Sequence, residues 1–111
     1  NLLDQFERRV AYQDDATGLE YLWFRPIFEC EVSSSLLAII ADFFLGAHSA
    51  TRGGTSLDNT FRVFALSPTD WVLNATQLSG IKNGMVQGHL HQFSQDGQLL
   101  ASASQTGLLP R

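Results

Sequence analysis

Asp42 is the residue whose position in this sequence most needs a chemical explanation. It lies near the C-terminal end of an otherwise apolar stretch, Leu36 to Leu45, where a helix dipole disfavours a carboxylate. Burying a carboxylate without a partner is also costly. Two interpretations are open at this point. Asp42 either caps a backbone group or pairs with an arginine such as Arg52, or it belongs to an active site, where ionisable groups in apolar surroundings are commonly found.

Gln105 and Ser56 are two further polar residues in positions suited to chemistry. Gln105 lies on the same face of the last strand-like run as Leu99, Ala101 and Ala103, so its amide is expected to point inward among small apolar groups. The alternative is a surface position on a twisted strand end. Ser56 starts a strand-like run after a glycine-containing loop, with Thr55 beside it. Taken alone, Ser56 is an ordinary hydroxyl at the start of a strand.

Other kinds of catalytic or metal site find little support in the sequence. It contains no G-x-S-x-G motif, and neither Cys30 nor any serine has a histidine at a spacing typical of a nucleophile and its general base. Cys30 is the single cysteine, which excludes an internal disulfide and a cysteine-based zinc site. His89 and His91 share one face of a strand without a third ligand nearby, so we expect them to face solvent or a partner subunit. We therefore expect neither a metal nor a cofactor.

Composition and charge exclude several classes of protein. The 111 residues fit one domain, and only 16% of them are charged, too few for a disordered segment. The net charge is -4 and the basic residues are scattered, so no nucleic-acid partner is expected. The most apolar stretch is too short to span a membrane. A single cysteine and the absence of a leader-like start favour an intracellular location, cytoplasmic or peroxisomal.

The elements that must position the candidate residues begin with an N-terminal segment and a strand. Residues 1–12 space their apolar side chains as in a helix, so they predict a short amphipathic helix before a polar break at 13–18. Residues 19–32 are rich in aromatic side chains with rough alternation, which predicts a strand. Pro26 in its middle indicates an edge strand or a bulge.

An apolar helix and four further strands complete the pattern. Three serines supply caps before a helix over 36–45, and Gly46 is a natural stop. Because this helix is apolar on all sides apart from Asp42, other elements must cover most of it. Asp96-Gly97 is the strongest hairpin signal, since a type I′ turn requires positive φ at both central residues. The four strand-like runs after the helix are 56–66, 71–78, 84–94 and 99–109.

This order of elements predicts an α+β fold. The simplest way to cover one apolar helix is to wrap a curved antiparallel sheet around it, which is the arrangement of the hot-dog fold. Residues 19–111 are expected to form a single domain of this kind, and residues 1–18 a linker or the remnant of a helix. Because the sheet edges stay free, we expect pairing with a second copy or a second domain.

The run over residues 95–109, QDGQLLASASQTGLL, resembles the C-terminal signature of type II acyl-CoA thioesterases, the TesB-like family. Three shorter segments resemble other motifs of that family in the same order: ADF at 41–43, SLD at 56–58 and WVL at 71–73. The resemblance covers residues of about 19 to 109. It corresponds to the second of the two hot-dog repeats in the full-length enzymes.

The resemblance implies an enzyme that hydrolyses fatty acyl-CoA to free fatty acid and CoA with an activated water. Asp42 matches the catalytic aspartate of the family and Gln105 its catalytic glutamine. Ser56 stands where the family usually has threonine, and Thr55 would supply the hydroxyl if the register shifts by one. The mechanism implied has Asp42 deprotonate a water held by the other two side chains, with no metal or redox cofactor. The family's Leu-Asp-His is Leu-Asp-Asn here, a departure that bears on substrate preference.

Two alternatives to hydrolysis remain open. A hot-dog dehydratase acting on hydroxyacyl thioesters generally uses a histidine with an acidic residue, but His48 follows the helix too late for that role. The other alternative is a non-catalytic half of a double hot-dog protein that binds acyl groups or supports dimerisation. The expected partners are thus an acyl-CoA substrate and either a second hot-dog domain or further copies of this chain in a homo-oligomer.

Overall fold

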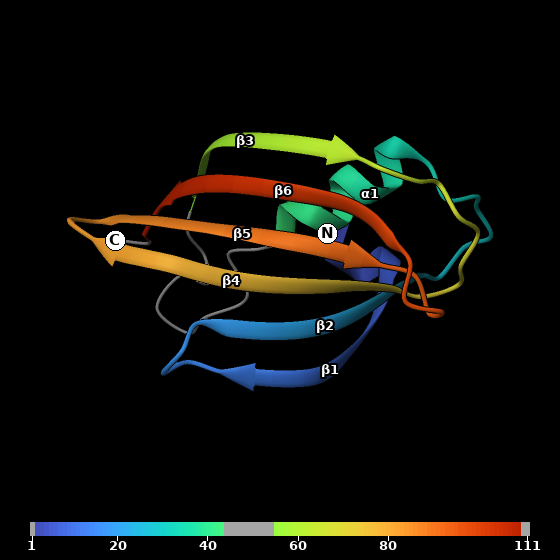
Figure 1. Ribbon diagram of the computed structural model, residues 1–111, viewed down its shortest axis with the longest axis horizontal. Coiled ribbons are helices and arrows are strands. Elements are labelled where there is room, and N and C mark those ends of the chain that lie inside the picture. Colours follow the sequence, from blue (N-terminus) through green and yellow to red (C-terminus); the bar gives the residue numbers. More distant parts are fainter. Residues whose placement is uncertain (1, 44–54, 110–111) are drawn as a thin grey trace.

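A computed structural model of the chain describes residues 2–43 and 55–109. A six-stranded antiparallel sheet, in the strand order β1-β2-β4-β5-β6-β3, curves around one α-helix, which lies behind it in Figure 1. The α+β architecture expected from the sequence is therefore confirmed. The elements in chain order are the 3-10 helix η1 (Leu2–Gln5), β1 (Phe6–Asp14), β2 (Leu19–Pro26), α1 (Ser34–Ala41), β3 (Thr55–Val63), β4 (Val72–Lys82), β5 (Met85–Phe93) and β6 (Leu99–Leu108).

Helix α1 forms where the serine run meets the apolar stretch. The side-chain oxygen of Ser33 accepts a hydrogen bond from the Leu36 N–H at 3.1 Å, which satisfies one of the free donors of the first turn. The helix buries four apolar side chains against the sheet: Leu36, Leu37, Ile40 and Ala41. Its C-terminal cap is Asp42, earlier than expected. Residues 44–45 and Gly46, where the sequence predicted the last turn and the stop, lie outside the described residues.

The central strands follow the period of two that the sequence predicts. Alternate residues of β4, β5 and β6 are buried on the face toward α1, while the residues between them are more exposed. The hydrophobic core lies between this face and the helix, and its largest fully buried apolar side chains are Phe24, Leu37, Ile40, Leu90 and Leu100. This packing places three inward-facing strands directly against the helix that ends at Asp42.

The N-terminal segment differs from the expected amphipathic helix. Only residues Leu2–Gln5 are helical, as a 3-10 turn, and Phe6–Asp14 form β1, paired antiparallel to β2. The helix-like spacing predicted that Phe6 and Val10 would share one buried face. In the structure Phe6 is buried in the core, whereas Val10 is 61% exposed. Long-range pairing with β2 outweighs a weak local period. Residues 6–14 therefore belong to the sheet rather than to a linker.

Two turn and strand assignments also change. Strand β2 lies between β1 and β4, so Pro26 does not mark an edge strand; it is the last residue of β2, where a missing N–H costs little. The type I′ signature occurs at Asn83 and Gly84, with φ of 55° and 76°, in the β4–β5 hairpin. Among the described residues, Asn83 is the single non-glycine residue with positive φ, so Asp96-Gly97 forms a different kind of turn.

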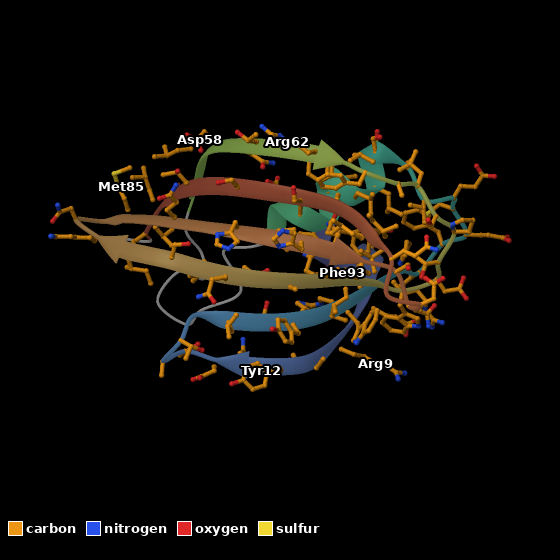
Figure 2. All side chains as sticks on the ribbon, viewed as in Figure 1. Arg9, Tyr12, Asp58, Arg62, Met85 and Phe93 are labelled. Carbon is orange, nitrogen blue, oxygen red and sulfur yellow. The ribbon has the colours of Figure 1, made fainter. Side chains whose placement is uncertain are left out.

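The two outer strands, β1 and β3, form the edges of the sheet. Figure 2 shows Arg9 and Tyr12 along β1 and Asp58 and Arg62 along β3, at opposite edges.

Neither helix of the described residues has the length and apolar character needed to cross a lipid bilayer.

Candidate active site

The structure places Asp42 immediately after the last turn of α1. Its backbone N–H is directed at the carbonyls of the preceding turn, and its side chain is exposed. The sequence placed Asp42 near the C-terminal end of a helix over 36–45, whereas α1 ends at Ala41 and Asp42 is its C-terminal cap. The pairing with Arg52 that we considered lies outside the described residues. Asp42 thus presents an accessible carboxylate at the end of a buried helix.

Both chain neighbours of Asp42 are anchored. Ala41 is fully buried, and its carbonyl accepts a hydrogen bond from Gln105 Nε2 at 3.0 Å. On the other side, the Phe43 ring stacks on Phe24, with centroids 5.4 Å apart and planes 19° apart. The same ring meets Phe6 edge-to-face at 5.9 Å. The backbone of Asp42 is therefore held from two directions while its side chain remains accessible.

Gln105 occupies the inward position that the sequence predicted. Only 1% of its surface is exposed, and it shares the buried face of β6 with Ala101 and Ala103. Leu99, which the sequence placed on the same face, is exposed, because the β5–β6 register shifts at this end of the strand. Its neighbour on β5 is Gly88, which has no side chain to compete for the space. Gln105 Oε1 is buried and accepts no hydrogen bond from the described residues. A buried carbonyl oxygen of this kind is an acceptor ready to bind a polar group at the helix end.

Ser56 is placed only through its backbone. It pairs with Gly107 of β6, two residues beyond Gln105, and a register shift follows between Ser56 and Asp58. The Asp58 carboxylate accepts a hydrogen bond from the Thr106 N–H at 3.2 Å, just past this irregularity. The side chains of Ser56 and Thr55 lie outside the described part of the chain, so their hydroxyls are not located.

The described histidines lie away from this region. His89 and His91 are exposed on β5, at positions that alternate with the buried residues facing α1. Their rings stand edge-to-face with centroids 6.2 Å apart. His48 lies outside the described residues. In the described part of the chain, no three His, Cys, Asp or Glu side chains group closely enough to hold a metal ion.

Two buried amides near the same helix end were missed by our sequence reasoning. Asn74 on β4 donates from Nδ2 to the Ile40 carbonyl at 2.8 Å. Gln92 on β5 donates from Nε2 to the Leu37 carbonyl at 2.9 Å and to Asn74 Oδ1 at 3.0 Å. Strand alternation could have found them, because both fall on the parity of the apolar inward residues. They were missed because inward and outward faces were assigned to individual residues in the last strand alone.

A separate hollow of about 340 Å³ lies near the start of α1, beyond the C-terminal end of β2. Leu36 and Cys30 line it together with Arg25, whose guanidinium forms an ion pair with Glu7. Of the candidate residues whose side chains are described, neither Asp42 nor Gln105 borders this hollow. It is therefore distinct from the C-terminal end of α1, where Gln105 contacts Ala41 beside Asp42.

Comparison with known proteins identifies the family. A family model described as the acyl-CoA thioesterase C-terminal domain matches residues 1–109. Among curated proteins none matches the chain.

Several solved structures resemble the chain closely. One is a candidate thioesterase from Novosphingobium aromaticivorans, with a TM-score of 0.88 and 30% identity over 98% of this chain and 44% of that one. Acyl-CoA thioesterase II TesB2 from Mycobacterium marinum has a TM-score of 0.78 and 22% identity over 97% and 50% of the two chains. A hot-dog protein of unknown function from Alicyclobacillus acidocaldarius has a TM-score of 0.82 and 18% identity over 97% and 46%.

These structures establish the fold as a hot-dog fold, as the sequence predicted. The chain spans about half of the length of each of the three. Because the family model covers nearly every residue, the match does not depend on a single motif. The chain belongs to the family of acyl-CoA thioesterase C-terminal domains.

Proposed function

We propose that this chain is a thioesterase domain that hydrolyses fatty acyl-CoA to free fatty acid and CoA, with Asp42 as its general base. The observation that carries the proposal is the hydrogen bond from the Gln105 amide to the carbonyl of Ala41, the residue before Asp42. It ties Gln105 to the residue that precedes Asp42 in the chain, although Gln105 and Asp42 lie 63 positions apart in the sequence. The family match supports a thioester substrate.

The proposed reaction is a direct attack by water on the thioester carbonyl. The Asp42 carboxylate accepts a proton from the water as the water oxygen bonds to the carbonyl carbon. The carbonyl oxygen becomes an oxyanion. When the tetrahedral intermediate collapses, the carbon–sulfur bond breaks and the CoA thiolate leaves. The thiolate takes up the proton held by Asp42, so the carboxylate is regenerated and no covalent acyl-enzyme forms.

Gln105 and Ser56 hold the reacting groups in this proposal. Gln105 Nε2 donates one proton to the Ala41 carbonyl, which leaves its second proton to donate to the water or the oxyanion and the unpaired Oε1 to accept from the water. Backbone N–H groups are the other candidate donors to the oxyanion. The Ser56 hydroxyl, or that of Thr55, is the third group that holds the water.

The domain is proposed to work beside a second hot-dog domain or a second copy of itself. The chain spans about half of the length of its two-domain-sized neighbours, which leaves room for one more domain of this size. A second domain would supply further walls of the acyl groove. Groove residues from the other half would then set the acyl chain length.

The proposal is tested by measuring thiol release from a medium- or long-chain acyl-CoA. Asp42→Asn removes the base but preserves shape, so kcat is expected to fall about 100-fold or more while the thermal unfolding temperature stays close to wild type. Asp70→Asn is the matched control, because Asp70 is another exposed aspartate and lies in the β3–β4 connection. The control variant should keep the wild-type rate.

Other results distinguish the alternatives. Unchanged turnover in a folded Asp42→Asn variant would exclude Asp42 as the base. A large loss of stability on the same change would assign it a structural role instead. If the chain releases no thiol by itself or when it is mixed with the other half, it is the non-catalytic alternative. Dehydration of a hydroxyacyl-CoA without thiol release would indicate the dehydratase.

A further inference from the structure

Three buried amides hold the end of α1 against the sheet, one from each of the neighbouring strands β4, β5 and β6. Each amide donates to a different helix carbonyl: Asn74 to Ile40, Gln92 to Leu37, and Gln105 to Ala41. Two of the contacts are to Ile40 and Ala41, immediately before Asp42, and the third is to Leu37, one turn earlier in the helix. Side chains of the sheet are therefore hydrogen-bonded to the helix backbone in this region.

Gln92 controls the orientation of Asn74. The two residues are directly opposite each other on β4 and β5, and Gln92 Nε2 donates to Asn74 Oδ1 at 3.0 Å. This bond keeps the Asn74 oxygen toward Gln92 and its Nδ2 toward Ile40. A flipped Asn74 would place its oxygen against the Ile40 carbonyl oxygen, where two acceptors repel. Gln92 therefore fixes two contacts to the helix, one directly and one through Asn74.

The helix does not need the Gln92 amide to satisfy its own hydrogen bonds. Leu37 lies inside α1, so its carbonyl already faces the N–H four residues later, that of Ala41. Gln92 Oε1 is also fully buried without a partner among the described residues, which is unfavourable. An apolar side chain of similar length would avoid that cost. The amide is thus better explained by the position it imposes than by stability.

We infer that Gln92 and Asn74 are positioning residues for Asp42. They fix the last turns of α1 on the sheet, and Gln105 fixes Ala41, so the exposed carboxylate starts from a defined place. A base displaced by about 1 Å loses much of its rate. This inference rests on the proposed function, in which Asp42 is the base. The positioning role goes beyond the proposed function because neither Gln92 nor Asn74 is assigned a contact with substrate.

The test uses Gln92→Met in the whole 111-residue chain. Methionine keeps the length of the side chain but removes both donated hydrogen bonds. Gln87→Met is the matched control, because Gln87 lies on the same strand with its side chain exposed. The first measurement is hydrogen exchange of the Ala41 and Asp42 N–H groups, which does not depend on activity. Gln92→Met should speed their exchange about tenfold, while the control and the β5 amides exchange as in the wild type.

The second measurement separates positioning from a structural role. Gln92→Met should lower kcat for acyl-CoA hydrolysis about tenfold with little change in KM, because only the base is displaced. In an Asp42→Asn background the same substitution should have no further effect on the residual rate, since the effect passes through Asp42. If Gln92→Met does not fold, Asn74→Leu removes the Ile40 contact and is expected to change both readouts in the same direction.

Three outcomes would overturn the inference. Unchanged exchange at Ala41 and Asp42 would do so whether or not the chain is active. Faster exchange with wild-type kcat, or an equal loss of kcat in both backgrounds, would show that the amides do not act through Asp42. Failure of the proposed function looks different: Asp42→Asn then keeps full turnover. In that case Asp42 is not the base and the amides cannot be positioning residues for it. The exchange rates still report whether the amides hold the helix end.

Discussion

At the scale of single residues, Gln105 combines a structural contact with a catalytic opportunity. Its Nε2 satisfies the Ala41 carbonyl, one of the terminal helix carbonyls that lack a partner within the helix. Its Oε1 remains without a partner among the described residues. Gln92 also has an unpaired oxygen, but its donor reaches a carbonyl inside the helix. The two glutamines should therefore respond differently to the same substitution.

Gln105→Met is expected to lower both stability and activity. The buried Ala41 carbonyl loses its donor, which costs about 1 to 3 kcal/mol of unfolding free energy. Loss of the amide that holds the water or the oxyanion should lower kcat about 100-fold. Denaturant unfolding and thiol release measure the two effects, with Gln87→Met as the exposed control. Wild-type kcat in a folded Gln105→Met variant would remove Gln105 from the proposed mechanism.

At the scale of elements, the β4–β5 hairpin is tightly constrained at Gly88. A Cβ at this position would lie 2.9 Å from the Gln77 carbonyl oxygen and 2.9 Å from Leu78 Cδ2. The register of the pair shifts next to this point, between Leu78 and Gly80. Gly88 is therefore required by close packing of two strands. Because Gly88 is also opposite Gln105, a distortion here reaches the candidate site.

Gly88→Ala is expected to destabilise the chain by about 1 to 3 kcal/mol, because the neighbouring backbone must move to admit a methyl group. Gly80→Ala on β4 is the matched control. A Cβ at Gly80 meets nothing within 4 Å, so its substitution should change the unfolding free energy by less than about 0.5 kcal/mol. Thermal and denaturant unfolding of the two variants provide the comparison. Equal stability of both variants would contradict the close packing assigned to Gly88.

At the scale of the whole molecule, the described surface includes apolar side chains at one end of the sheet. Ile27 and Phe28 follow β2, and Phe64 and Leu66 follow β3; each is about half exposed or more. In Figure 1 the ends of β2 and β3 lie toward the same end of the sheet. Exposed apolar surface and two open sheet edges favour association with another domain.

We expect the isolated chain to form at least a dimer in solution. Two copies would bring together the number of hot-dog domains suggested by the length of the related structures. Light scattering after size-exclusion chromatography should then give at least about twice the 12.3 kDa mass of one chain. Dilution should lower the unfolding temperature, because dissociation is linked to unfolding. A monomeric mass at every concentration, with a constant unfolding temperature, would contradict this expectation.

The sequence alone determined the local secondary structure around α1 and the faces of the residues in β6. The cap at Ser33 and the apolar helix after it follow from residue chemistry, as does the inward position of Gln105. Residues that alternate along β6 have their faces set by the pleat of a strand, whatever lies opposite. The α+β class and the wrapping of a sheet around one helix were predictable because a single apolar helix needs cover from the strands. The cap, the helix and the strand faces depend on a few neighbouring residues, whereas the fold class was predictable from the order of the elements along the chain.

The arrangement of distant residues was decided only by the tertiary structure. The strand character of Phe6–Asp14 depends on pairing with β2, and the interior place of Pro26 depends on that same pairing. Helix α1 ends before Asp42, which leaves the carboxylate exposed rather than buried. Three amides from separate strands meet the end of that helix. Sequence periodicity specifies which face a side chain occupies, whereas the identity of the group it meets there depends on contacts between residues far apart in the chain.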